Sequence, residues 1–164
     1  MTSLSIDRHD NLSSGAFHRI AASVLSTDGS LRLTILRLAL GLVILPHGLQ
    51  KTIGWFGGYG FDATLGYFSG IGIPAFFGFL AIAAESLGAI ALITGFTTRI
   101  AAFGIAVTML VASSMHAANG FFMNWSGQQK GEGFEYHILA IAIAVVLMIG
   151  GAGRFSLDRL VTRR

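Results

Sequence analysis

Three histidines have the widest chemical repertoire in this sequence: His47, His116 and His137. Imidazole binds zinc, copper, iron and haem, and it also forms hydrogen bonds with a quinone carbonyl. The three lie in separate apolar segments, but each is near the segment end predicted to face the same side. No two share one helix face, so their spacing is not that of a metal motif, and we predict no metal site. Taken singly, each also fits a hydrogen-bonded residue at a helix end.

Charged residues extend this layer of histidines. Lys51 lies one helical turn after His47, and Glu135 is beside His137. The predicted ligand-binding set lies at one end of the apolar segments, except for a deeper carboxylate. Its members are His47, Lys51, Glu85, His116, Glu135 and His137. The sequence shows no nucleophile elbow, phosphate-binding glycine motif or paired catalytic carboxylates, so no residue is assigned a catalytic role.

The deeper carboxylate is Glu85, near the middle of the second apolar segment, where a lone charge is costly and needs a partner. It lies about 18 Å from the start of that segment and about 12 Å from the far edge of a hydrocarbon core about 30 Å thick. Arg37 lies about 9 Å from the same edge. We therefore predict a structural ion pair between Arg37 and Glu85. The carboxylate either fixes how two helices dock, or it relays protons or contacts a ligand.

Two stretches rich in glycine and aromatic residues lie between these segments, at 54–72 and 119–135. Glycine and aromatic rings together allow a backbone to fold closely against a bilayer surface. One interpretation is a lid of interfacial loops. The other is an aromatic roof, formed by Trp55, Phe56 and Trp125, that stacks on a flat, lipid-soluble ligand.

The composition indicates which elements position these residues. Of 164 residues, 53% are apolar and only 12% are charged, and the mean hydropathy is +0.69. Soluble domains have about twice that share of charge, so the composition excludes a soluble enzyme, a disordered protein and a nucleic-acid-binding module. A membrane crossing needs roughly 20 apolar residues, and backbone groups in lipid must be satisfied within a helix. Four segments meet this description: 31–49, 73–94, 100–118 and 136–151, the last being the shortest.

The basic residues predict the orientation of this four-helix bundle. With four crossings, all of them except Lys51 and Lys130 lie on one side, which is therefore cytoplasmic and holds both termini. They are Arg8, Arg19, Arg32, Arg37, Arg99, Arg154, Arg159, Arg163 and Arg164. We expect three parts: an N-terminal segment (1–30), which is a tail or an interfacial helix, a transmembrane domain (31–153) and a basic tail (154–164).

Small residues are expected to hold the helices together, because lipid is as apolar as leucine. One stripe is Gly104, Thr108, Ala112 and His116; two others are Ala81 with Glu85, and Ala84 with Gly88. Cysteine is absent from the chain, which excludes disulfide and thiol chemistry within it.

Several short runs carry a resemblance to a known family. They are RLALG (37–41), PHGLQK (46–51), GWFGG (54–58), TTR (97–99), NGFF (119–122), FEYH (134–137) and GAGRFSLD (151–158), together with Glu85 and His116. As a set, they resemble the DoxX family of small four-helix membrane proteins, over roughly residues 31–159. The resemblance implies a bacterial inner-membrane protein. It also implies, for some relatives, a role as a subunit of a quinone-reducing oxidoreductase or as a partner in a redox-stress assembly. The lack of cysteine departs from related redox proteins that relay electrons through thiols.

Three functions remain open from the sequence. The first is a subunit or accessory of a quinone-linked redox system, in which electrons come from a partner enzyme or a small reductant. The second is a non-catalytic membrane scaffold or assembly partner. The third is a transporter or channel, for which the sequence lacks inverted repeats and broken midplane helices, although a homo-oligomer could form a pore. Quinone is the cofactor we favour over metal or haem, and the expected contacts are the lipid bilayer and a redox partner, not nucleic acid.

Overall fold

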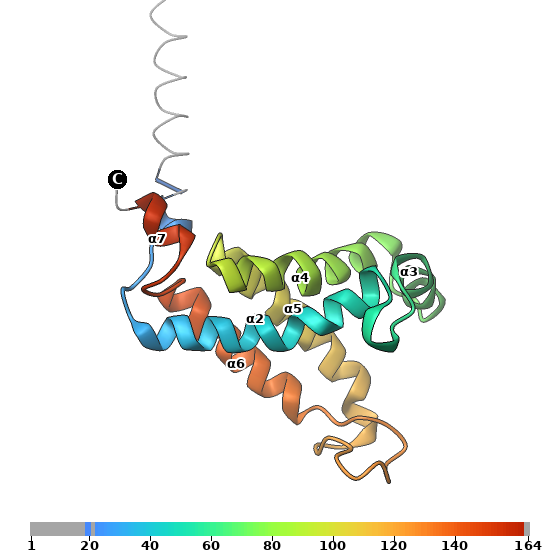
Figure 1. Ribbon diagram of the computed structural model, residues 1–164. Coiled ribbons are helices and arrows are strands. Elements are labelled where there is room, and N and C mark those ends of the chain that lie inside the picture. Colours follow the sequence, from blue (N-terminus) through green and yellow to red (C-terminus); the bar gives the residue numbers. More distant parts are fainter. Residues whose placement is uncertain (1–18, 21, 163–164) are drawn as a thin grey trace, which may run out of the picture.

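A computed structural model describes residues 19–20 and 22–162, and in these residues the fold is helical, without strands. Four long helices form the body: α2 (Leu31–Thr52), α4 (Ala75–Thr94), α5 (Thr98–His116) and α6 (Glu135–Gly150). They coincide with the four apolar segments predicted from the sequence (Figure 1). In the described chain, α2, α4 and α5 (with its 3-10 extension to Asn119) are long and apolar enough to cross a membrane, whereas α6 is a shorter apolar helix.

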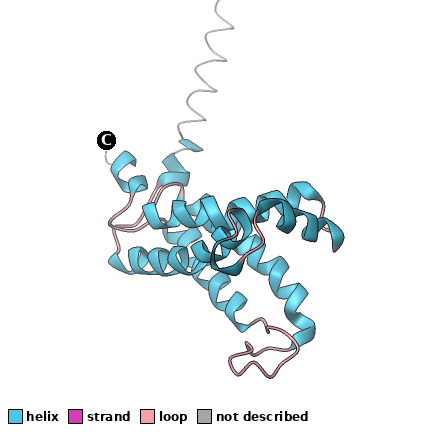
Figure 2. Ribbon diagram, turned by 45° about the vertical axis from the view of Figure 1, so that its right-hand side comes forward, coloured by secondary structure: helices cyan, strands magenta, loops and turns pink. Residues whose placement is uncertain are grey.

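The four helices pack in a ring, in which α2 contacts α4 and α6, and α5 contacts α4 and α6. One end of the ring, which we call the arginine end, contains Arg37 and Arg99. The opposite end, which we call the histidine end, contains His47, His116 and His137. The helices lie close together at the arginine end, and the α2–α4 pair diverges from the α5–α6 pair toward the histidine end (Figures 1 and 2). Burial agrees with this shape, because no residue of α5 after Met109 is buried.

Small residues set the closest helix contacts. A side chain at Gly48 of α2 would lie 2.6 Å from the Cα of Ser86, so the backbones of α2 and α4 touch there. The predicted stripes also lie in contacts: Gly104 of α5 packs on the Ala84 side chain, and Gly88 of α4 packs toward Ile105. Close approach at glycine is the expected way to pack helices where apolar burial provides no preference between protein and lipid.

Arg37 is the largest fully buried side chain of the arginine end, with 1% of its surface exposed. Its guanidinium donates hydrogen bonds to four backbone carbonyls: those of Leu92 and Ile93 at the end of α4, and those of Ala152 and Phe155 after α6. The predicted ion pair between Arg37 and Glu85 is therefore wrong. The depth estimate placed Arg37 within reach of Glu85, but the carbonyls of Leu92 and Ile93 at the C-terminal end of α4 lie nearer and accept its hydrogen bonds.

The basic tail predicted at 154–164 contains the short helix α7 (Leu157–Thr162). Its Asp158 is buried and accepts hydrogen bonds from the backbone N–H groups of Thr97 (2.6 Å) and Thr98 (2.9 Å), where α5 begins. A carboxylate at this position pairs with the free N–H groups and the positive end of the helix dipole. The segment after α6 is thus packed onto the bundle.

The helix that follows α2 was also not predicted from the sequence. The glycine-rich stretch at 54–72, interpreted above as a loop, contains a 3-10 turn η1 (Trp55–Gly57) and the helix α3 (Phe61–Gly70), which packs on α4. Its glycines, Gly66 and Gly70, hid the helical pattern. The proposed N-terminal interfacial helix lies mostly outside the described residues; within 1–30, the described residues 19–20 and 22–25 are helical.

Candidate ligand site at the histidine end

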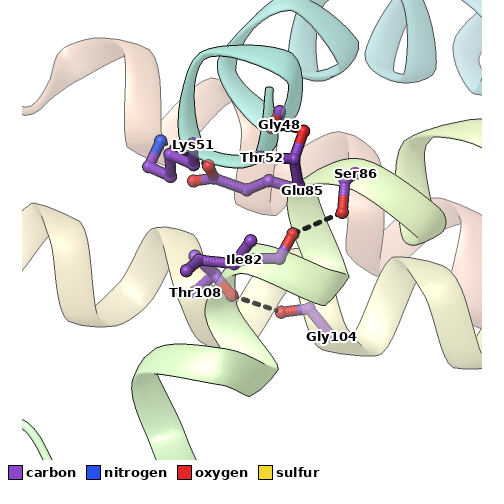
Figure 3. Close-up of polar contacts among 8 residues, drawn as sticks. All are labelled: Gly48, Lys51, Thr52, Ile82, Glu85, Ser86, Gly104 and Thr108. Carbon is purple, nitrogen blue, oxygen red and sulfur yellow. Dashed lines mark hydrogen bonds and ion pairs between the residues drawn. The ribbon is translucent and has the colours of Figure 1, made fainter. Parts of the chain in front are cut away.

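The only carboxylate near the middle of a long helix in the described chain, Glu85, is 4% exposed and forms an ion pair with Lys51. The Lys51 Nζ and Glu85 Oε2 atoms are 2.5 Å apart, and the two side chains meet between α2 and α4 (Figure 3). Lys51 is in the last turn of α2, so its long side chain reaches back along the bundle to Glu85. The partner of the buried acid is thus a lysine from the predicted ligand set.

Gly48 lets the backbones of α2 and α4 approach closely enough for this ion pair to form. It lies one turn before Lys51 and rests on the α4 backbone at Glu85 and Ser86 (Figure 3). Neighbouring hydroxyls bond within their own helices, Ser86 to the Ile82 carbonyl and Thr52 to the Gly48 carbonyl. Because these hydroxyls bond within their own helices, the polar contact between α2 and α4 at this point is the Lys51–Glu85 ion pair.

The three histidines lie in a row with a tyrosine that the sequence analysis did not select. The rings of His116 and His137 are stacked with centroids 5.1 Å apart. Tyr136 lies 5.7 Å from His137 and 6.4 Å from His47. His47 is close enough to Lys51 and Glu85 to interact with both charges, and Tyr136 interacts with Glu85. The row therefore joins the ion pair to the end of α5.

Two polar atoms in this row are buried without a hydrogen-bond partner, the Tyr136 hydroxyl oxygen and the His137 Nδ1. A buried polar atom that stays unpaired costs about 1–3 kcal/mol, so such atoms call for an explanation. Both belong to neighbouring residues at the start of α6 and lie in the same layer as Glu85 and His47. A water molecule or a polar ligand between the diverging helix pairs would satisfy them.

Glu135, in contrast, already has hydrogen-bond partners within the protein. Its carboxylate accepts hydrogen bonds from the backbone N–H of Met123 (2.9 Å) and from the indole N–H of Trp125 (3.0 Å). It fastens the loop between α5 and α6 to the start of α6.

The rings of the predicted aromatic roof are not brought together. Trp55 and Phe56 contact each other after α2, whereas Trp125 belongs to the loop after α5, on the other side of the diverging helices (Figures 1 and 2). Trp125 is 86% exposed, and Trp55 and Phe56 are exposed as well. The position of these rings does not support a single roof that stacks on a ligand.

Tyr136 could have been found from the sequence. It stands between Glu135 and His137 in the run FEYH, so it starts an apolar helix with its hydroxyl near the helix end. At such a position a tyrosine usually lies at the membrane interface, where its hydroxyl reaches water.

The geometry defines what the site can do. It offers one buried acid–base pair, imidazoles from three helices, and two unpaired polar atoms. In the described residues, no three His, Cys, Asp or Glu side chains are grouped closely enough to hold a metal ion. The arrangement can hold a proton at the Lys51–Glu85 pair and can donate hydrogen bonds to a neutral, oxygen-bearing ligand.

Comparison with known proteins agrees with the motifs. A family model, DoxX, matches residues 32–125, which is more than half of the chain. This chain is a member of the DoxX family. No curated protein and no solved structure gave a significant match. The DoxX domain and the apolar helices together identify an integral membrane protein.

Proposed function

We propose that this DoxX-family chain is a subunit or accessory of a quinone-linked membrane redox system, and that its histidine end binds the quinone head group. The observation that carries the proposal is the pair of buried, unpartnered polar atoms on Tyr136 and His137. A quinone head has two carbonyl oxygens that need hydrogen-bond donors, and a Tyr hydroxyl and an imidazole N–H supply them.

The topology that suits this role has four crossings. The helix α6 has 16 residues, or about 24 Å at 1.5 Å per residue, and it packs along α5 and α2. A crossing by α6 leaves both termini on the side of the arginine end. The positive-inside tendency then favours a cytoplasmic arginine end, and a periplasmic histidine end in a bacterial inner membrane.

The residues of the site fit a quinone by charge and by polarity. The Lys51–Glu85 pair is neutral as a whole, so an uncharged ligand can lie beside it without meeting an unpaired charge. The helix pairs diverge at this end (Figures 1 and 2).

A bound quinone supplies two-electron chemistry, in which its reduction to the quinol takes up two protons. Within this chain, Tyr136 and His137 orient the carbonyl oxygens beside the Lys51–Glu85 ion pair. The chain has no cysteine that could pass electrons through a disulfide. The electrons come from a partner oxidoreductase or directly from a small reductant.

The sharpest test removes one oxygen atom. Tyr136→Phe keeps the ring and deletes the unpartnered hydroxyl, so stability should stay the same or rise while quinone affinity falls about threefold to tenfold, the value of one neutral hydrogen bond. Tyr67→Phe is the matched control, because Tyr67 is an exposed residue of α3. Affinity is measured by titrating purified protein with ubiquinone-1 and menadione and following intrinsic fluorescence.

Equal affinity in Tyr136→Phe and in the wild type would refute the assignment of that hydroxyl. Absence of any quinone binding, and absence of quinone from organic extracts of protein purified from native membranes, would refute the proposed function. In that case the scaffold role is favoured, and companion proteins in the same purification would support it.

A further inference from the structure

The structure has an open hollow of about 530 Å³ at the arginine end, far from the histidine row. It is lined by the end of α4, by the segment that leads into α7 and by α7 itself. Its lining is Thr94, Arg154, Phe155, Ser156, Leu157, Arg159 and Leu160. Neither the ligand site nor the contacts that hold the bundle together uses this hollow.

Two cations line the hollow, and no carboxylate lines it. The guanidinium of Arg154 lies 5.4 Å from the centre of the Phe155 ring, and its side chain is exposed. The Nη1 atom of Arg159 is buried and has no hydrogen-bond partner. The nearby acid Asp158 is occupied by the N–H groups at the start of α5, so it does not neutralise these arginines directly.

The hydroxyls of the lining are engaged elsewhere. Thr94 donates to the Ile90 carbonyl and Ser156 donates to the Gly153 carbonyl. The donors that remain for a ligand are therefore those of the two arginines. Two guanidinium groups that line one hollow favour an anion with several oxygen atoms, such as a phosphate, over a neutral molecule.

The remaining lining is apolar and exposed. Phe155 is 64% exposed and Leu160 is 63% exposed, and Leu157 and Val161 are also exposed on α7. They stand where the apolar helices α4 and α6 end, which is the depth of the lipid head groups for a chain that crosses the bilayer. A freely soluble phosphate compound gains nothing from such side chains, whereas the upper part of an acyl chain does.

We propose that this hollow is a binding site for the phosphate of an anionic glycerophospholipid, with Arg154 and Arg159 as the phosphate donors and Phe155 and Leu160 against the acyl chains. The lipid phosphate pairs with the guanidinium groups of Arg154 and Arg159, and it also keeps the segment from Arg154 to α7 seated on the bundle. Basic hollows beside membrane helices are suited to such head groups by charge and by position. The site is independent of quinone binding.

The test uses the purified full chain and native mass spectrometry, with phosphatidylglycerol and phosphatidylcholine as probes. The wild type should retain phosphatidylglycerol over phosphatidylcholine, and this preference should weaken as salt is raised. The variant R154Q/R159Q should lose the preference by roughly fivefold for each arginine removed. The matched control is R32Q/K130Q, which removes the same charge from exposed positions outside the hollow.

Three outcomes would overturn the proposal: equal retention of the two lipids by the wild type, equal loss in the control variant, or displacement of phosphatidylglycerol by millimolar inorganic phosphate with equal affinity. The last would identify a site for free phosphate. The comparison of lipids on the wild type stands even if R154Q/R159Q does not fold, because that measurement needs no substitution.

Discussion

The buried charged groups at the arginine end and the buried polar groups at the histidine end differ in how many partners they have within the protein. At the arginine end, Arg37 gives its donors to four carbonyls and Asp158 takes two backbone N–H groups. At the histidine end, Glu85 has one partner, Lys51, and polar atoms of Tyr136 and His137 have none. The first pattern, that of Arg37 and Asp158, is a structural joint, because both side chains are matched within the protein. The second leaves donors free for something other than the protein.

The difference teaches that a charge at membrane depth does not by itself indicate function. Arg37 is more deeply buried than Glu85 and yet serves helix ends, since the last carbonyls of α4 and those after α6 lack partners within their helices. What separates the two cases is the balance of donors and acceptors around each group. Three sets of substitutions test this distinction, beginning with the largest expected effect.

Replacement of Arg37 should be the most damaging change at the arginine end. Arg37→Met keeps much of the side-chain volume but leaves the carbonyls of Leu92, Ile93, Ala152 and Phe155 without their donor. At about 1–3 kcal/mol for each unpaired buried group, the loss should exceed about 3 kcal/mol. Thermal unfolding in detergent, followed by tryptophan fluorescence, measures it.

Arg32→Met is the control for that experiment, because Arg32 is an exposed arginine of the same helix. It should change the unfolding temperature little. Similar losses for the two variants would show that the carbonyl contacts of Arg37 contribute nothing beyond the charge, and the contrast between the two ends would fail.

Addition of a methyl group at Gly48 should have the next largest effect. Gly48→Ala drives the new side chain into the α4 backbone at Ser86 and pushes Lys51 away from Glu85. Overpacking of this kind costs about 1–3 kcal/mol. The control is Gly66→Ala in α3, where a new side chain meets no atom within 4 Å and should stabilise the helix by up to about 1 kcal/mol. Equal unfolding temperatures for the two variants would contradict the backbone contact.

Disruption of the Lys51–Glu85 ion pair should have the smallest effect on stability. Lys51→Met and Glu85→Gln should each cost about 1 kcal/mol or more, since each leaves one polar group unpaired. The double variant should cost less than the sum of the two by about 1 kcal/mol, which is the signature of a direct interaction. Thermal unfolding of all three variants measures it, with the loop residue Lys130→Met as a control.

Quinone titration of the same double variant sharpens the comparison between the ends. If the histidine end serves a ligand, quinone affinity should fall in the double variant even though its stability largely recovers. Strict additivity in the unfolding experiment would show instead that the two side chains do not interact.

Much of the fold follows from the sequence for a simple physical reason. A segment of about 20 apolar residues has only the helix available to it in lipid, so residues 31–49 and 73–94 could be assigned without knowledge of their neighbours. The stretch at 61–70 was missed because glycine is a poor helix former, and only packing on α4 compensates for it.

The site was predictable in its members but not in its pairings. Residue type and depth selected Glu85, Lys51 and the histidines, because polar groups are rare where water is absent. Depth alone assigned Glu85 to Arg37, whereas the partner is Lys51. A depth estimate reports position along the bilayer normal and carries no information on the direction in which a side chain points around its helix.

The sequence by itself thus determined that the chain enters a membrane, where its helices lie and which residues are too polar for their depth. Only the tertiary structure decided how those residues pair, since the choice between Lys51 and Arg37 depends on the contact at Gly48 and on the carbonyls at the end of α4. Insertion into lipid is a property of each segment's composition. Pairing depends on the rotation of each helix, which is set by close contacts between segments far apart in the chain.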